Sequence, residues 1–166
     1  PAEVTRSYQA AARLLDAGIS VSKAETDDGP KFLIPASDQF ARAALTELSG
    51  DLGITVSVDP SGVRERMAQL PARVGLYQGW AGAMDEGWTR LVLEEFDYLY
   101  ETLSNDDVRT PALGERFDVI ILPSEISLTQ LVDGNTSDQT PPEYRGGIGE
   151  EGVENLKAFV RGGGTL

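Results

Sequence analysis

The chain has 166 residues, 40% of them hydrophobic, which suits one ordinary globular domain or one domain with a small companion. Its 27 acidic against 14 basic residues give a formal net charge of −13, which excludes nucleic acid as a partner because a phosphate backbone needs a basic surface. No apolar run approaches the roughly 20 residues of a membrane-spanning helix. Histidine and cysteine are both lacking, so carboxylates, hydroxyls and amides remain for chemistry, and a supporting or binding domain is favoured over a self-sufficient enzyme.

Residues 1–70 predict a small α/β subdomain. The expected elements, in chain order, are a helix at 4–16, strands at 19–22 and 32–34 that form a hairpin, a helix between Ser37 and Gly53, a strand at 54–58 and a helix at 60–69. Ser37 is the expected N-cap of the second helix, and Phe40 belongs to its expected buried stripe. We expect the subdomain boundary at Leu70–Pro71, because a helix usually ends before a proline.

Residues 71–166 predict strands that alternate with longer helices. The expected elements are strands at 74–77, 98–103 and 117–122 and helices at 84–97 and 149–161, with Val160 on the buried side of the last helix. The strand at 117–122 is almost continuously apolar, as is typical of a parallel strand covered on both faces. A further apolar run starts near Gly163, and we interpret it as a strand that the end of the chain interrupts. The pattern favours an α/β domain with a doubly wound parallel sheet, truncated at its C-terminus.

Two loops leave the carboxyl ends of the predicted strands, where doubly wound sheets gather their ligands. The loops combine amides, an aromatic ring and carboxylates, which are groups that typically line a pocket for a polar ligand. Their candidate ligand or interface residues are Gln78, Trp80, Asp85, Glu86, Ser124 and Glu125.

Structural roles compete with ligand contact at these positions. Asp85 suits the cap of the helix that it opens, and Glu86 suits the first turn because of the helix dipole. Trp88 is expected in the core, whereas Trp80, in a glycine-rich loop, is the better candidate for an exposed contact or for burial against a neighbouring domain. A third hypothesis pairs Glu125 with Asp85 or Glu86 as the acid and base of a hydrolase.

Residues 134–149 form a long, polar and irregular segment, and such a loop is usually functional or disordered. Within it, Tyr144 supplies a stacking ring and Arg145 a fork-shaped cation. These two candidates suit a small ligand and an interdomain seam equally well.

Five blocks of sequence carry a family resemblance. They are Tyr77-Gln-Gly-Trp80, Met84-Asp-Glu-Gly-Trp-Thr-Arg90, Phe117-Asp-Val-Ile-Ile-Leu-Pro123, Pro141-Pro-Glu-Tyr-Arg-Gly-Gly147, and the segment from Glu150 through Gly162-Gly-Gly-Thr-Leu166. In this order they resemble the class I glutamine amidotransferase-like domain that follows the catalytic domain of bacterial M14-type zinc carboxypeptidases. Residues 1–70 resemble the less distinctive segment that joins that domain to the peptidase.

The resemblance implies a secreted or periplasmic parent protein whose zinc-binding residues lie upstream of Pro1. It also implies that the nucleophile of active amidotransferase relatives would fall just beyond Leu166. Active relatives often have glycines after a strand like 117–122, where backbone donors help to hold an oxyanion, but this chain has Ser124-Glu125 there.

We therefore expect a non-catalytic accessory domain with a structural or substrate-positioning role. The expected partner is its own upstream peptidase domain, and the domain is expected to need no cofactor of its own. The alternative is a ligand-binding or oligomerisation module of the same fold, in the latter case acting as a homo-oligomer.

Overall fold

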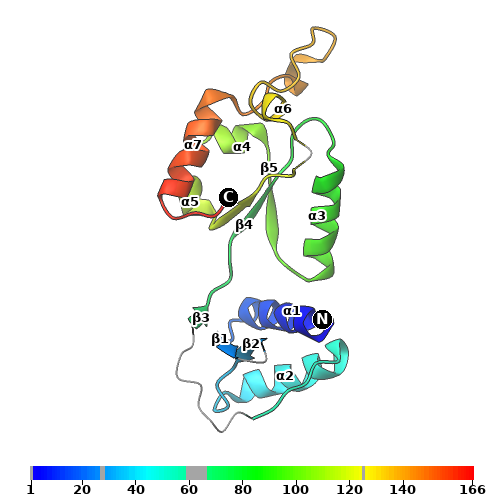
Figure 1. Ribbon diagram of the computed structural model, residues 1–166, viewed down its shortest axis with the longest axis vertical. Helices are drawn as coiled ribbons and strands as arrows, with labels where there is room; N and C mark the ends of the chain where they lie inside the picture. The colour runs from blue at the N-terminus through cyan, green and yellow to red at the C-terminus, as the bar shows by residue number, and fades with distance from the viewer. Residues whose placement is uncertain (1, 27–28, 59–66, 125) are drawn as a thin grey trace. The chain divides into compact units, whose positions relative to one another are not determined.

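The computed structural model describes residues 2–26, 29–58, 67–124 and 126–166, and it divides into two compact units (Figure 1). The first unit runs to Pro71 and includes Phe96–Tyr98. The second unit comprises Ala72–Glu95 and Leu99–Leu166. Both units are mixtures of helices and strands, so the predicted α/β class is confirmed at this level.

The first unit is built on a three-stranded antiparallel sheet with the order β2-β1-β3. Its elements are α1 (Ala2–Asp16), β1 (Val21–Thr26), β2 (Gly29–Leu33), α2 (Gln39–Leu52) and β3 (Met67–Gln69). The predicted hairpin is confirmed by the pairing of β1 with β2, in which Ser22 lies opposite Leu33. Leu14 of α1, Val21 of β1 and Ala41 of α2 are almost completely buried in one apolar cluster.

Helix α2 begins one residue later than predicted. Its N-cap is Asp38, whose carboxylate accepts hydrogen bonds from the backbone N–H groups of Phe40 (2.9 Å) and Ala41 (3.1 Å). Phe40 is 75% exposed, and the core position belongs instead to Ala41, which lies two helical turns from the buried Leu48. The prediction of Ser37 as cap and Phe40 as core is therefore wrong. Gly53 ends the helix in a left-handed conformation (φ 60°), as its glycine signal indicates.

The third strand of the first unit comes from an unexpected segment. Residues 54–58 alternate like a strand but are not one, and Val58 is 84% exposed. Instead, Met67–Gln69 pairs antiparallel with the free edge of β1, so Val21 lies opposite Gln69. The predicted helix at 60–69 is wrong for these three residues, and the rest of it lies outside the described residues. An alternating pattern makes a strand only where a neighbouring edge is available, and that condition is tertiary.

The second unit is built on a three-stranded parallel sheet with the order β5-β4-β6. Its strands are β4 (Val74–Tyr77), β5 (Tyr100–Leu103) and β6 (Val119–Ile121), and Val74 of the central strand lies opposite Tyr100 and Val119. All three strands were predicted, although β5 and β6 are shorter than expected. The final apolar run reaches this sheet at Thr165, which forms a parallel bridge with Val119.

Figure 1 shows α3 (Met84–Glu95) on one side of the parallel sheet and the helices α4, α5 and α7 on the other. The bounds of the remaining elements are α4 Asn105–Arg109, α5 Leu113–Arg116, α6 Leu128–Val132, the 3-10 helix η1 Pro142–Tyr144 and α7 Gly149–Arg161. The long helices α3 and α7 were predicted, but α4, α5 and α6 are too short to show a hydrophobic period.

Two apolar side chains of these helices are more exposed than the sequence indicates. Trp88 is 61% exposed. The buried face of α3 carries Glu86, and Trp88, two residues later, points about 200° away from it, to the opposite face of the helix. Val160 of α7 is 46% exposed, while its neighbour Phe159 is buried. The predictions of a core Trp88 and a buried Val160 are therefore wrong.

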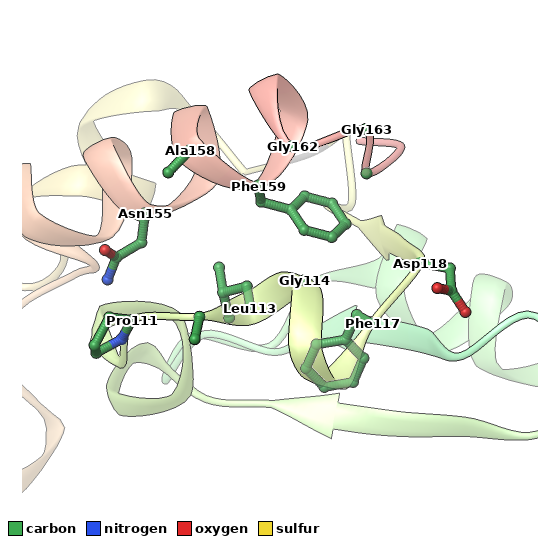
Figure 2. Close-up of a pocket in the computed structure, with 12 residues that line it drawn as sticks. Pro111, Leu113, Gly114, Phe117, Asp118, Asn155, Ala158, Phe159, Gly162 and Gly163 are labelled. Carbon is green, nitrogen blue, oxygen red and sulfur yellow. The ribbon is translucent and has the colours of Figure 1, made fainter.

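The core of the second unit lies between the parallel sheet and α7. It includes Leu103, Ile120, Leu156 and Phe159, which are all at least 94% buried. Figure 2 shows Leu113, Phe117 and Phe159 beside a small pocket of about 350 Å³ between α5 and α7. We call it the amino-edge pocket because Phe117 and Asp118 directly precede β6.

An ion pair ties the amino ends of β4 and β6 together. Arg73 donates to both carboxylate oxygens of Asp118, at 2.7 Å to Oδ1 and 3.1 Å to Oδ2, and its backbone N–H adds a bond of 2.8 Å. These bonds stabilise the charged carboxylate, so they lower the pKa of Asp118 to about 2.

Candidate functional site

A cavity larger than the amino-edge pocket lies beyond the carboxyl ends of β4 and β5. Tyr77 is the last residue of β4, and Asn105 begins α4 directly after β5 and Ser104. The segment from α6 to α7, coloured yellow to orange in Figure 1, supplies the opposite wall. This is the edge of a parallel sheet where loops with functional side chains converge.

The cavity has a volume of about 850 Å³, inside the range of roughly 300–1,000 Å³ that is usual for small-molecule sites. We call it the carboxyl-edge cavity. Its described lining residues are Tyr77, Gly79, Trp80, Ala81, Gly82, Ala83, Asn105, Ile126, Gln130, Gly134, Asn135, Thr136, Ser137, Thr140, Tyr144 and Gly146.

A buried pair of side chains forms part of the cavity lining. The Tyr77 hydroxyl donates to Oδ1 of Asn105 at 2.6 Å, and Nδ2 of Asn105 donates to the carbonyl oxygen of Gly146 at 3.1 Å. These two bonds use the acceptor and a donor of the amide and so define its orientation. Burial raises the pKa of Tyr77, although the Arg109 guanidinium opposes this, so the hydroxyl keeps its proton at neutral pH.

The loop 134–147 forms the far wall and is closed by a contact between glycines at its base. Gly134 has φ +67°, and a Cβ atom added there would lie 2.0 Å from the carbonyl carbon and oxygen of Gly146. Only glycine allows both this backbone conformation and this approach. Gly146 N–H also donates to the carbonyl oxygen of Asn135 at 3.0 Å. The long irregular segment is therefore an ordered loop with its own closure.

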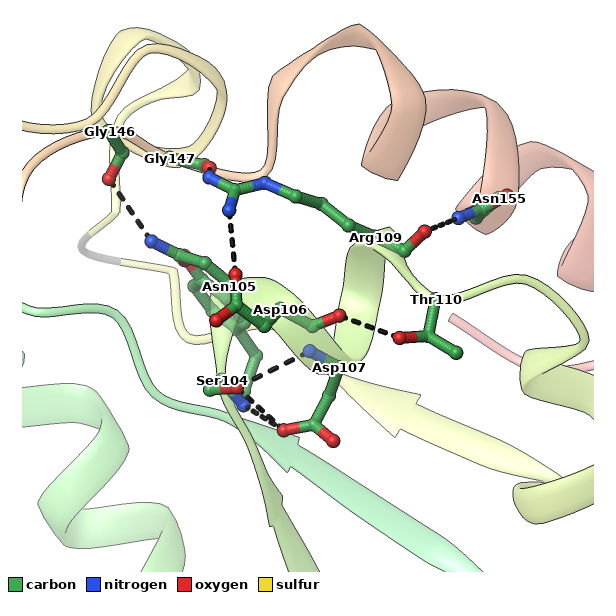
Figure 3. Close-up of polar contacts among 10 residues, drawn as sticks. Ser104, Asn105, Asp106, Asp107, Arg109, Thr110, Gly146, Gly147 and Asn155 are labelled. Atoms are coloured by element: carbon green, nitrogen blue, oxygen red, sulfur yellow. Dashed lines mark hydrogen bonds and ion pairs between the residues drawn. The ribbon is translucent and has the colours of Figure 1, made fainter. Parts of the chain in front are cut away.

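Helix α4 anchors the returning end of this loop (Figure 3). Arg109 donates to the carbonyl oxygen of Gly147, one residue after the bond from Asn105 to Gly146. Asn155 of α7 in turn donates to the carbonyl oxygen of Arg109 at 2.6 Å, so the anchoring helix is held from its other end. The loop is thereby positioned by the same core that supports the sheet.

A capping box starts α4 and places Asn105. The Ser104 hydroxyl oxygen accepts from the backbone N–H of Asp107 (3.3 Å), and the Asp107 carboxylate accepts from the backbone N–H of Ser104 (2.9 Å). The Ser104 hydroxyl also donates to Oδ2 of Asp107 at 2.7 Å, and this bond, with the Ser104 backbone N–H and Arg116, lowers the pKa of Asp107. Sequence reasoning missed Tyr77 and Asn105, although the Ser-x-x-Asp pattern after a strand was a usable signal for a helix start here.

Trp80 and Tyr144 come together at the carboxyl-edge cavity. Their rings are 5.2 Å apart and nearly perpendicular, with an interplanar angle of 83°. Trp80 is 51% exposed and Tyr144 48% exposed, so part of each aromatic surface remains free for another molecule. Whether Trp80 makes an exposed contact or is covered by a neighbouring domain stays a prediction, as does ligand contact at either ring.

Asp85 and Ser124 form a second pair of candidates, outside the cavity lining. The Ser124 hydroxyl donates to Oδ2 of Asp85, which connects the loop after β6 to the first turn of α3. Asp85 lies inside this turn rather than at the cap. Glu86 is only 8% exposed and forms an ion pair with Arg90, four residues further along α3.

The remaining candidates take different places. The side chain of Gln78 is not among the cavity lining, and its backbone N–H donates to the carbonyl oxygen of Leu103 at 2.8 Å. Arg145 donates to the carbonyl oxygens of Thr140 and Asp138, both at 2.6 Å, and so braces its own loop. Glu125 lies outside the described residues.

The described part of the chain contains no cluster of three His, Cys, Asp or Glu side chains that is placed to hold a metal ion. Among the helices that the structure describes, none combines the length and the apolar character needed to cross a membrane. Searches of protein-family models, of curated protein sequences and of solved structures find no match to this chain.

Proposed function

We propose that residues 72–166 form a non-catalytic recognition domain of the class I glutamine amidotransferase-like type, which positions substrate for an M14-type zinc carboxypeptidase. The carboxyl-edge cavity carries this proposal, because an ordered loop, a buried Tyr77–Asn105 pair and an aromatic pair build one concave surface. In this proposal the zinc ion belongs to the upstream peptidase domain of a secreted or periplasmic parent, and residues 1–71 join that domain to the recognition domain.

The sheet topology supports the doubly wound architecture. If β4, β5 and β6 are numbered 1, 2 and 3 in chain order, their order in the sheet is 2-1-3. The bridge between Thr165 and Val119 of β6 adds a fourth position beyond strand 3. The flavodoxin-like sheet has the order 2-1-3-4-5, and its ligands bind where the strand order reverses. In this sheet the reversal lies at β4, whose carboxyl end borders the cavity.

The site chemistry supports binding rather than proton transfer. The described lining consists of aromatic, amide, hydroxyl, aliphatic and glycine groups. Glu86 is engaged with Arg90, and Asp85 accepts from Ser124. We therefore assign recognition to the cavity and a structural role to these two carboxylates.

A variant of the full-length zinc carboxypeptidase tests this assignment. Trp80→Ala is expected to raise KM several-fold at unchanged kcat for peptide substrates that reach the cavity, because it removes binding that the ground state and the transition state share. Phe40→Ala, which removes an exposed ring from α2 of the first unit, is the matched control and is expected to leave both constants unchanged. An unchanged KM in Trp80→Ala, or glutaminase or peptidase turnover by the purified 166-residue chain, would contradict the proposal.

One observation favours a second function, that of an oligomerisation module. Helix α3 exposes four large apolar side chains at helical spacing: Met84, Trp88, Leu91 and Val92. Such a stripe on one face of a helix is suited to association. Light scattering of the chain distinguishes the two functions: a stable dimer or trimer that Leu91→Asp dissociates favours assembly, whereas a monomer favours recognition alone.

A further inference from the structure

The described side chains that line the carboxyl-edge cavity are all electrically neutral. They are aromatic, amide, hydroxyl or aliphatic, although 25% of the residues in the chain are charged. A ligand in this cavity therefore meets hydrogen-bonding groups and apolar surface rather than ion-pair partners among the described lining residues. This composition selects a neutral ligand, because a charged one would lose hydration without gaining an opposite charge.

The aromatic pair offers two surfaces at nearly a right angle. Trp80 and Tyr144 meet at 83°, and each keeps about half of its surface exposed. The face of an aromatic ring is negative, so it attracts the weakly positive C–H groups of a packed molecule. A ring-shaped ligand with a C–H face fits against such a wall.

The polar part of the lining supplies donors and acceptors together. Oδ1 of Asn135 accepts from the backbone N–H of Ser137 at 2.9 Å, which directs the NH₂ group of the amide away from that turn. The Ser137 hydroxyl oxygen accepts from the backbone N–H of Gln139 at 3.2 Å and still carries a proton to donate. Gln130 and Thr136 are also lining residues, and their side chains carry one more amide and one more hydroxyl.

We propose that the carboxyl-edge cavity binds a short neutral saccharide attached to the peptide substrate, an inference that rests on the recognition function proposed above. Each pyranose ring has a C–H face for Trp80 or Tyr144 and a rim of hydroxyls, and every hydroxyl both donates and accepts, as the amides and hydroxyls of the lining do. A free amino acid or a peptide terminus uses this lining less well, because its charges find no partner among the described lining residues.

Fluorescence of a chain with one tryptophan tests the ligand class. The chain has two tryptophans, so Trp88→Phe leaves Trp80 as the sole reporter. The probes are cellobiose, maltose and N,N′-diacetylchitobiose. We expect a saturable change in Trp80 emission with at least one of them, with a Kd that changes less than twofold between 0.05 and 0.5 M NaCl, since salt screens only charged contacts.

Two further variants in the same background locate the binding. Tyr144→Ala is expected to weaken saccharide binding about tenfold, which corresponds to the loss of one aromatic contact. Phe40→Ala is the control and is expected to bind as the background does. A saturable saccharide response that Tyr144→Ala leaves unchanged would place the sugar elsewhere and overturn the proposal.

Further probes separate this proposal from the recognition function. L-glutamine, L-glutamate and acetyl-triglycine amide are titrated in the same way. If one of these saturates the Trp80 signal and no saccharide does, the saccharide assignment is overturned while recognition at the cavity stands. If no probe of either kind produces a response, the saccharide assignment is overturned, and the KM of Trp80→Ala in the full-length enzyme decides the recognition function separately.

Discussion

The two ends of the parallel sheet in the second unit differ in what surrounds them. At the amino end, the smaller pocket is bordered by Phe117 and Phe159, and the Asp118 carboxylate is bound by Arg73. At the carboxyl end, the larger cavity is lined by amides, hydroxyls and two exposed aromatic rings. The same strands thus border packed apolar side chains at one end and a cavity lined by polar and aromatic groups at the other. We therefore expect side chains at the amino edge to contribute to stability, and exposed side chains at the carboxyl edge such as Trp80 to contribute little to it.

The largest expected loss of stability comes from a packed side chain at the amino edge. Phe159→Ala should lower the free energy of unfolding by about 3–5 kcal/mol, because it removes a buried ring and leaves a cavity under α7. Urea denaturation followed by circular dichroism measures the change. Leu128→Ala, at an 80% exposed position of α6, is the control and should stay within about 0.5 kcal/mol of the parent chain. A loss below about 1 kcal/mol for Phe159→Ala would remove the contrast between the edges.

A smaller loss is expected where the carboxyl edge itself has a structural component. Asn105→Ala removes the acceptor of the buried Tyr77 hydroxyl and the donor to Gly146, which should cost about 1–3 kcal/mol. Relative to the parent chain, the substitution should accelerate amide hydrogen exchange more in the loop 134–147 than in α7. Gln139→Ala removes an exposed amide from the same loop and serves as the control. Uniform protection in Asn105→Ala would mean that Asn105 does not position the loop.

The ion pair at the amino edge predicts a dependence on pH. The pKa of Asp118 is lowered from 3.8 to about 2 in the folded state, so the unfolded state binds the proton more readily between these values. The stabilisation is therefore complete above pH 3.8 and is lost as the pH falls toward 2. Asp118→Asn should lower the melting temperature at pH 6 and reduce its dependence on pH in this window. If the melting temperature falls with pH in the same way in the variant and in the parent chain, the ion pair contributes nothing to stability.

The smallest expected effect on stability is at the carboxyl-edge cavity. Trp80→Ala should change the free energy of unfolding by only about 0.5–1 kcal/mol, since the ring is half exposed and its main contact is one aromatic partner. Thermal melts of the two chains measure it. A loss as large as that of Phe159→Ala would make Trp80 a core residue and erase the distinction between the two edges.

Several elements were predictable because their signals are local. The helical period of α1 and α7, the glycine that ends α2 and the apolar run of β6 all depend on neighbours within a few residues, and the structure confirms them. Predictions failed where a local pattern needed a distant partner. Residues 54–58 alternate but find no strand beside them, and Met67–Gln69 takes the free edge of β1 instead.

The candidate site was predictable in part. The rule that ligands gather at the carboxyl ends of parallel strands located Trp80, and the length and polarity of the segment 134–149 singled out Tyr144. The sequence did not indicate that these two rings meet, because their contact joins loops that are far apart along the chain. Asn105 was missed for the same reason, since its bond to Gly146 spans 41 residues.

The sequence alone determined the periods of the elements, the acidic charge and the absence of imidazole and thiol chemistry, because each is a property of composition or of short range. The tertiary structure decided which side chains share a surface. The 2-1-3 strand order brings the end of β4 beside the start of α4, and the contact between Gly134 and Gly146 folds a polar loop over both. A cavity whose described lining is neutral, in a chain of charge −13, follows from that assembly, because long-range contacts, and not local propensity, select the residues that line it.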